Sequence, residues 1–146
     1  GTQNKLRHLA WRTLDIIRRE PVLARYMLME LRPDPNYKST QFFEFNKKFT
    51  HEVLQLCRDA INSGEFHSDV SPNMLRDMLH GFIEHRTWAF LRGEGDFDID
   101  EVADSIAKVI YRGMRATQPA TARDIDRAIA RLDELAVRLE SKLGGS

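Results

Sequence analysis

Residues 71–91 read SPNMLRDMLHGFIEHRTWAFL, and this stretch decides the fold class. Ser71 followed by Pro72 is the preferred order for a helix cap and the first helical position. The apolar side chains that follow recur at helical steps but spread well beyond one stripe, and they are Met74, Leu75, Met78, Leu79, Phe82, Ile83, Trp88, Ala89, Phe90 and Leu91. A helix that is apolar around most of its girth must contact more than one partner.

Helical spacing of apolar residues continues on both sides of this segment, and no stretch alternates with the period of two that a half-buried strand requires. We expect further helices at about residues 4–19, 21–31 and 39–63, one that Asp98 or Asp100 caps, and a last one over 121–143. Pro21 separates the first two, because proline is tolerated in the first turn of a helix and not inside one. The sequence therefore predicts an all-α bundle of about six helices.

The composition is that of a folded globular chain: 146 residues, of which 42% are hydrophobic and 30% charged. Because 22 basic residues balance 22 acidic ones, the chain lacks the cationic excess that binds phosphates, and we expect no DNA binding by this chain alone. The single Cys57 lies in an apolar periodic segment and indicates a reducing compartment. Since no membrane span or signal peptide is evident, we expect a cytoplasmic protein without membrane contact.

Residue patterns that carry chemistry are missing from the sequence. We find no nucleophile beside a base, no carboxylate pair in an apolar setting, and no Gly-rich loop between a strand and a helix. Gly93-Glu94-Gly95 has the spacing of an interhelical turn. We expect no enzymatic activity and no cofactor.

His80 and Glu84 could belong to a metal site. They lie one helical turn apart, and a third ligand such as His51 could join them from another helix. His85 cannot complete such a site, since five helical steps turn it about 140° away from His80. We favour polar groups that are satisfied in a dimer seam, and we expect no metal.

The runs Gly64-Glu65-Phe66, Asp69-Val70-Ser71-Pro72 and 78–85 (MLHGFIEH), followed by Trp88 and by Ala103, Asp104, Ile106, Val109 and Gly113, resemble the C-terminal half of TetR-type repressors. The resemblance covers roughly residues 5 to 115. It implies that the fourth and fifth helices of two copies form a four-helix dimer interface, and that the first four helices enclose an apolar pocket for a small effector. The family's DNA-binding helix-turn-helix has no counterpart in this chain, so we expect DNA contact only through a domain not present here.

Two sets of residues follow as candidates. The candidates for contact with an effector are Trp11, Leu14, Tyr26, Phe45, Phe49, Met78 and Phe82, because aromatic and methionine side chains suit adaptable apolar sites, although ordinary core packing explains each of them singly. The candidates for the dimer interface are Leu79, Ile83, Trp88, Leu91, Ile106 and Ile110. A fourth helix with more apolar surface than one core can cover supports a homodimer independently of the resemblance.

The last helix lies beyond the usual length of the family. Its apolar residues step by four and three, the spacing of a short coiled-coil seam, and they are Ile125, Ile129, Leu132, Ala136, Leu139 and Leu143. This helix could extend the dimer interface or cover the mouth of a pocket. We divide the chain into an effector-binding and dimerisation domain over 1–118 and an appended helix over 119–146.

The sequence thus predicts the ligand-sensing and dimerisation domain of a TetR-type regulator, which binds a small apolar or amphipathic effector. The alternative is a helical assembly module without a small-molecule ligand. A sensor should contain a cavity, whereas an assembly module should be packed solid.

Overall fold

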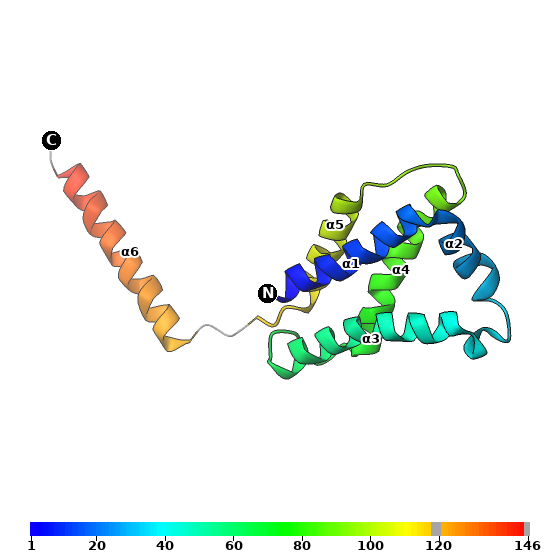
Figure 1. Cartoon of the computed structure of the whole chain (residues 1–146). Helices are drawn as coiled ribbons and strands as arrows, with labels where there is room; N and C mark the ends of the chain where they lie inside the picture. Colours follow the sequence, from blue (N-terminus) through cyan, green and yellow to red (C-terminus); the bar gives the residue numbers. More distant parts are fainter. Residues whose placement is uncertain (118–120, 145–146) are drawn as a thin grey trace. The chain divides into compact units, whose positions relative to one another are not determined.

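The structure, a computed structural model, describes residues 1–117 and 121–144, and within them the ordered elements are helical (Figure 1). In chain order they are α1 (Thr2–Arg19), α2 (Pro21–Tyr26), the π-helical η1 (Met27–Leu31), the 3₁₀-helical η2 (Tyr37–Ser39), α3 (Gln41–Asn62), α4 (Pro72–Leu91), α5 (Ile99–Met114) and α6 (Ala122–Leu143). The only backbone pairing of the β type among these residues is one isolated antiparallel bridge between Phe66 and Arg115. The prediction of an all-α fold is confirmed.

The chain forms two separate compact units, Gly1–Ala116 and Thr117–Ser146. The predicted boundary between residues 118 and 119 falls outside the residues that the structure describes. The first unit holds α1 to α5, and the second holds α6.

Capping residues that the sequence predicts lie at the ends of the long helices. The side chain of Ser71 accepts a hydrogen bond from the Met74 N–H at 3.2 Å and so caps α4, and Pro72 occupies its first turn. Of the two aspartates considered for α5, Asp98 is the cap. Gly64, in the turn after α3, has a φ of +76°, which glycine adopts without strain.

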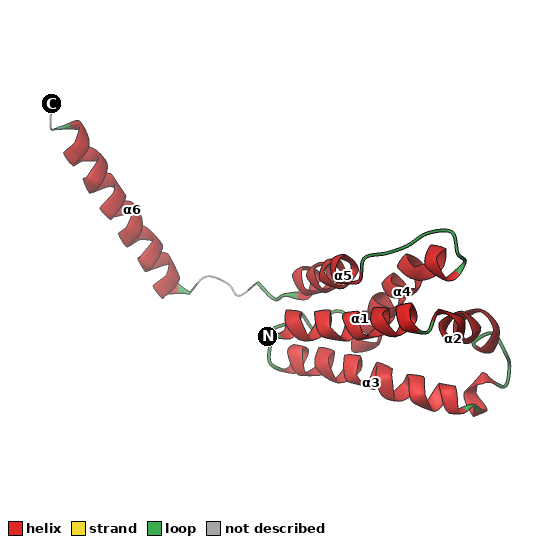
Figure 2. Cartoon of the chain, turned by 45° about the horizontal axis from the view of Figure 1, so that its top comes forward, coloured by secondary structure: helices red, strands yellow, loops and turns green. Residues whose placement is uncertain are grey.

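The core of the first unit is built around α1 and α4, each of which packs on several other helices. Figure 2 shows α1 running between α5 and α3, while α4 crosses behind it. Leu6, Leu14, Leu75, Leu79 and Ile83 are buried at this crossing. Part of the apolar surface of α4 is buried inside the unit, where α4 contacts α1, α2, α3 and α5, whereas Met74, Met78, Phe82 and Trp88 remain exposed.

Two polar groups of the first unit have perturbed surroundings. Arg7 of α1 forms ion pairs with Asp100 at 2.6 Å and Asp104 at 2.5 Å, which tie α1 to the start of α5. Cys57 of α3 is fully buried, and this burial raises the pKa of its thiol to about 11. The thiol is therefore protonated and unreactive at neutral pH.

The second unit consists of α6 and short flanking segments. A capping box begins α6, because the Thr121 side chain accepts from the Asp124 N–H while the Asp124 carboxylate accepts from the Thr121 N–H. All described side chains of α6 are exposed, including those of the predicted seam. No helix in residues 1–117 or 121–144 has the length and apolar character that crossing a membrane requires.

Candidate functional site

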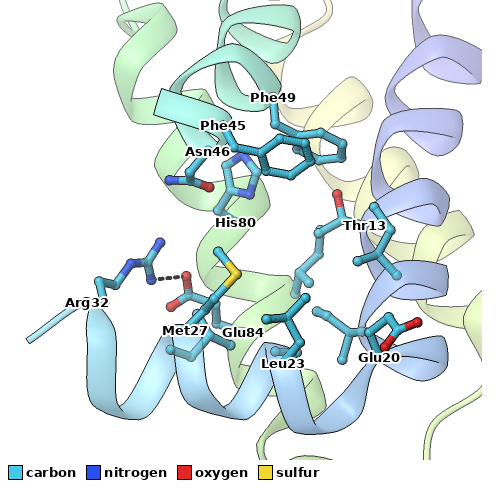
Figure 3. A pocket seen from close by; sticks show the side chains of 15 residues that line it. Thr13, Glu20, Leu23, Met27, Arg32, Phe45, Asn46, Phe49, His80 and Glu84 are labelled. Carbon is cyan, nitrogen blue, oxygen red and sulfur yellow. Dashed lines mark hydrogen bonds and ion pairs between the residues drawn. The ribbon is translucent and has the colours of Figure 1, made fainter. Parts of the chain in front are cut away.

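A cavity of about 130 Å³ lies in the first unit among α1, α2, η1, α3 and α4 (Figure 3). Its lining is mostly apolar and comprises Thr13, Ile16, Ile17, Glu20, Leu23, Ala24, Met27, Leu28, Arg32, Phe45, Asn46, Phe49, His80, Ile83 and Glu84. Pro21 creates this space, because it ends α1 and lets α2 turn away. The cavity is largely apolar and opens to solvent on one side, and small ligands commonly bind in spaces of this kind.

Aromatic and aliphatic side chains form the apolar wall. Phe45 and Phe49 lie one turn apart on α3, and Figure 3 shows both rings on the same side of the cavity, with Leu23 and Met27 across from them. Phe45 is 60% exposed and Leu23 is 40% exposed, so part of this wall faces solvent at the mouth. A ligand that covered these side chains would remove apolar surface from water, worth roughly 25 cal/mol per Å².

The polar wall of the cavity is made by His80 and Glu84 of α4 together with Arg32. His80 and Glu84 lie one turn apart, and Arg32, which follows η1, donates a hydrogen bond to the Glu84 carboxylate at one side of the cavity (Figure 3). The Nε2 atom of His80 is buried and has no hydrogen-bond partner among the described residues. Burial is the main cause that lowers the pKa of His80 below its ordinary value of 6.5, while Glu84 acts in the opposite direction.

The structure separates the seven residues predicted to contact an effector. Phe45 and Phe49 line the cavity. Leu14 is fully buried in the core, and Trp11 packs against that core. Tyr26, Met78 and Phe82 are exposed on other surfaces, Phe82 in a shallow hollow between α4 and α5. Contact of any of the seven with a ligand stays a prediction.

Sequence reasoning missed most of the lining, in particular Thr13, Ile16, Leu23, Met27, Arg32 and Asn46. The step of four from Phe45 to Phe49 marks one wall in the sequence, and the step from His80 to Glu84 marks the other. The sequence suggests metal ligation or a dimer seam for His80 and Glu84, and not the wall of a cavity. No sequence signal connects Arg32 to them, because their contact spans 52 residues.

The six residues predicted for a dimer interface divide in the same way. Leu79, Ile83, Leu91, Ile106 and Ile110 are buried within one chain, and Trp88 is 45% exposed. The large apolar side chains exposed on α4 and α5 are Met74, Met78, Phe82, Trp88 and Val109. Five of the six candidates therefore contribute to the subunit core, and their contact with a second copy is untested.

The residues considered for a metal site do not meet. His51 lines a different hollow, between α1 and α3, whereas His80 and Glu84 line the cavity. Within residues 1–117 and 121–144 no group of three or more potential metal-binding side chains occurs.

Comparison with known proteins gives a family match. Residues 1–114 match the family described as "Tetracyclin repressor-like, C-terminal domain". The matched residues span α1 to α5 and end before α6. No curated protein and no solved structure shows a significant match to the chain. Domains of this family generally bind effectors and dimerise in regulators. On the strength of a match over more than half of its length, the chain belongs to the tetracycline repressor-like C-terminal domain family.

Proposed function

We propose that this chain is the ligand-sensing and dimerisation part of a TetR-type transcriptional regulator, and that a small, mainly apolar effector occupies the cavity among α1 to α4. The observation that carries the proposal is the cavity itself: an apolar space of about 130 Å³ inside a chain whose family generally binds effectors. A module built only for assembly would be packed solid at this position. DNA is bound through a domain not present in this chain.

The size of the cavity bears on the size of the effector. Ligand pockets commonly measure about 300–1,000 Å³, so the observed space is small for a drug-sized molecule. The half-exposed Phe45 and Leu23 stand at the mouth, and the π-helical turn Met27–Leu31 forms part of the rim. Irregular turns of this kind are frequent at functional sites. The effector is either small or widens the cavity by moving these side chains.

A signal from the cavity has a direct route to the start of the chain. Thr13, Ile16 and Ile17 bring α1 into the cavity wall, and the same helix continues to Thr2 through the buried core. Trp11 and Leu14, on that helix, are positioned to transmit its movement. The effector acts by binding one arrangement of α1 more tightly than the other, since a ligand shifts a two-state equilibrium only by its differential affinity.

Dimerisation uses the outer surface of α4 and α5. Met74, Met78, Phe82 and Trp88 on α4 lie at helical steps, and Val109 of α5 adds to the exposed apolar surface. A patch of this kind on a folded domain indicates a protein interface. Two copies that bury it against each other form a four-helix interface.

Native mass spectrometry of the purified chain tests the proposal. We expect a dimer that carries a small molecule, which denaturation releases for weighing. Ala24→Phe should fill the cavity and abolish the bound mass while the dimer persists. The matched control Ala130→Phe, on the exposed α6, should retain it. A clean dimer without bound mass, and without thermal stabilisation by any member of an apolar ligand library, would instead support the assembly module.

A further inference from the structure

The polar wall of the cavity contains an unsatisfied hydrogen-bonding atom. Among the described residues, only Arg18 Nε and His80 Nε2 are buried without a partner. Arg18 uses its Nη2 in a 2.9 Å ion pair with Asp96, and its guanidinium lies over the Phe97 ring. His80 has no comparable contact, and it lines the cavity. A buried polar atom without a partner costs free energy, which a ligand group at hydrogen-bonding distance would recover.

The charges around His80 restrict what this ligand group can be. The charged lining residues are Glu20, Arg32 and Glu84, which leave one excess negative charge, and Arg32 is already paired with Glu84. Arg76 and Asp77 on the same helix add one charge of each sign near His80. Because burial lowers the pKa of His80, its imidazole is neutral at pH 7. A carboxylate entering here would meet a like charge and find no free cation in the lining.

We infer that the effector is an uncharged, mainly apolar molecule with a hydroxyl group that hydrogen-bonds His80 Nε2. A hydroxyl suits either tautomer of a neutral imidazole, because it can donate and accept. The flat rings of Phe45 and Phe49 favour a planar or aromatic body beside that hydroxyl. This inference rests on the proposed function, since it concerns the chemistry of the same cavity.

Three matched probes test the inference by equilibrium dialysis at pH 7: 2-naphthol, naphthalene and 2-naphthoate. We expect 2-naphthol to bind roughly tenfold more tightly than naphthalene, as one hydrogen bond to an otherwise unsatisfied group predicts, and 2-naphthoate to bind most weakly. His80→Phe should abolish the preference for the hydroxyl, and His80→Gln should retain part of it. His85→Phe, an exposed position on the same helix, is the control and should leave all three affinities unchanged.

The outcomes separate this inference from the proposed function. If naphthalene binds but the hydroxyl adds nothing, or if 2-naphthoate binds most tightly, the inference is wrong while the cavity remains a ligand site. If His80→Phe leaves the preference intact, the hydroxyl lies elsewhere and the inference is again wrong. If none of the probes binds to the folded chain, both the inference and the proposed effector site fail.

A second, independent observation concerns α6, which the family match does not cover. Its apolar seam has an acidic edge on one side, made by Asp126, Asp133 and Glu140. Next to the seam on the opposite side lie Ala128, Leu135 and Lys142, and Arg131 and Arg138 lie farther round the helix. Asp124 also lies on that side, in the first turn, where its carboxylate accepts hydrogen bonds from Thr121 in the capping box and keeps its charge. The seam therefore has an acidic edge on one side and, on the other, a mostly apolar edge with basic residues beyond it.

This asymmetry distinguishes the possible arrangements of two identical helices. In a parallel pair related by a two-fold axis, the acidic edge of each helix faces the opposite edge of the other, so acidic residues do not meet each other across the seam. In an antiparallel pair, acidic residues face acidic residues, and Asp133 near the centre of the helix meets its own copy. Like charges that face each other across a seam are destabilising.

We propose that α6 pairs in parallel with α6 of a second copy of this chain. Three heptads are short for an isolated coiled coil, but attachment to a domain that already dimerises makes the pairing intramolecular, with an effective concentration in the millimolar range. The exposed seam residues are the contacts of this pair, and Ile125 of one helix lies beside Ile125 of the other.

Cysteine cross-linking of the full chain tests the direction. Ile125→Cys alone should form a disulfide-linked dimer under mild oxidation, because the parallel arrangement places the two copies of residue 125 together. Arg127→Cys, on the outer side, should not. Efficient cross-linking only between Ile125→Cys in one chain and Leu139→Cys in the other would show an antiparallel pair and overturn the proposal.

Sedimentation equilibrium provides a readout without oxidation. Leu132→Asp should weaken the dimer at least tenfold, and Val137→Asp should not, although both side chains are 65% exposed in α6. Equal dimer affinity in the two variants, with no cross-link at residue 125, would show that α6 does not pair with itself.

Discussion

The helices α4 and α6 have similar lengths and rich apolar content, but they use it differently. Leu75, Leu79 and Ile83 of α4 are buried inside the first unit, whereas Ile129, Leu132 and the other apolar residues of α6 are exposed. Periodicity in the sequence therefore indicates that a helix face requires a partner, but it does not indicate whether that partner belongs to the same chain. The predictions below test this contrast.

The largest expected effect is on the folding of the first unit. Leu79→Ala removes a fully buried side chain from α4 and should lower the free energy of unfolding by about 2–5 kcal/mol, through lost burial and a residual cavity. Leu132→Ala, at an exposed seam position of α6, should change it by less than about 0.5 kcal/mol in dilute solution. Urea denaturation measures both. Similar losses would contradict the division into two units.

The next effect concerns association through the outer side of α4. Phe82→Asp places a charge on the apolar surface that two copies bury in the proposed dimer, and it should weaken the dimer by a factor of ten or more. Phe45→Asp alters a more exposed phenylalanine at the cavity mouth and should leave the dimer intact. Sedimentation of the two variants side by side decides whether this surface is the interface.

The helix caps allow a smaller comparison. Ser71→Ala removes the side-chain acceptor for the Met74 N–H and should destabilise the first unit by about 1 kcal/mol. Thr121→Ala removes the capping box of α6 and should instead reduce helical content in circular dichroism, without shifting the unfolding midpoint of the first unit. A shift of that midpoint by Thr121→Ala would show that the two units are energetically coupled.

The smallest expected effect is the pH dependence from His80. Because burial lowers its pKa below the unfolded value of 6.5, the unfolded state binds more protons than the folded state as the pH falls below 6.5. The stability that His80 contributes is thus present above pH 6.5 and is lost as the pH falls through the folded pKa. His80→Phe should flatten this part of the stability profile, whereas His85→Phe should not. Identical profiles for both variants would contradict the buried, neutral imidazole.

Much of the fold could be predicted from the sequence because its signals are local. Ser71-Pro72, Pro21 and the capping aspartate of α5 act within one turn of chain, and they set the helix boundaries that the structure shows. The direction of each side chain is harder to predict from the sequence. The helix α4 is apolar on several faces, and periodicity alone cannot distinguish its inner from its outer side.

The site depended on contacts that helical patterns do not encode. Phe45 and Phe49 share a face by their spacing, so their position in one wall could be anticipated. Leu14, predicted to contact an effector, is fully buried among neighbouring helices, whereas the turn at Pro21 leaves space around Thr13 and Ile17. The pairing of Arg32 with Glu84 depends on where η1 ends relative to α4, which is a tertiary property.

The most direct test of the effector cavity is a methyl NMR titration of the methionines with 2-naphthol. Met27 lines the cavity, Met114 is buried elsewhere in the core, and Met74 is exposed on α4. Our account predicts a saturable shift of the Met27 methyl signal, with Met74 and Met114 almost unchanged. An unchanged Met27 signal, or a dominant shift at Met74, would contradict the assignment of the cavity as the effector site.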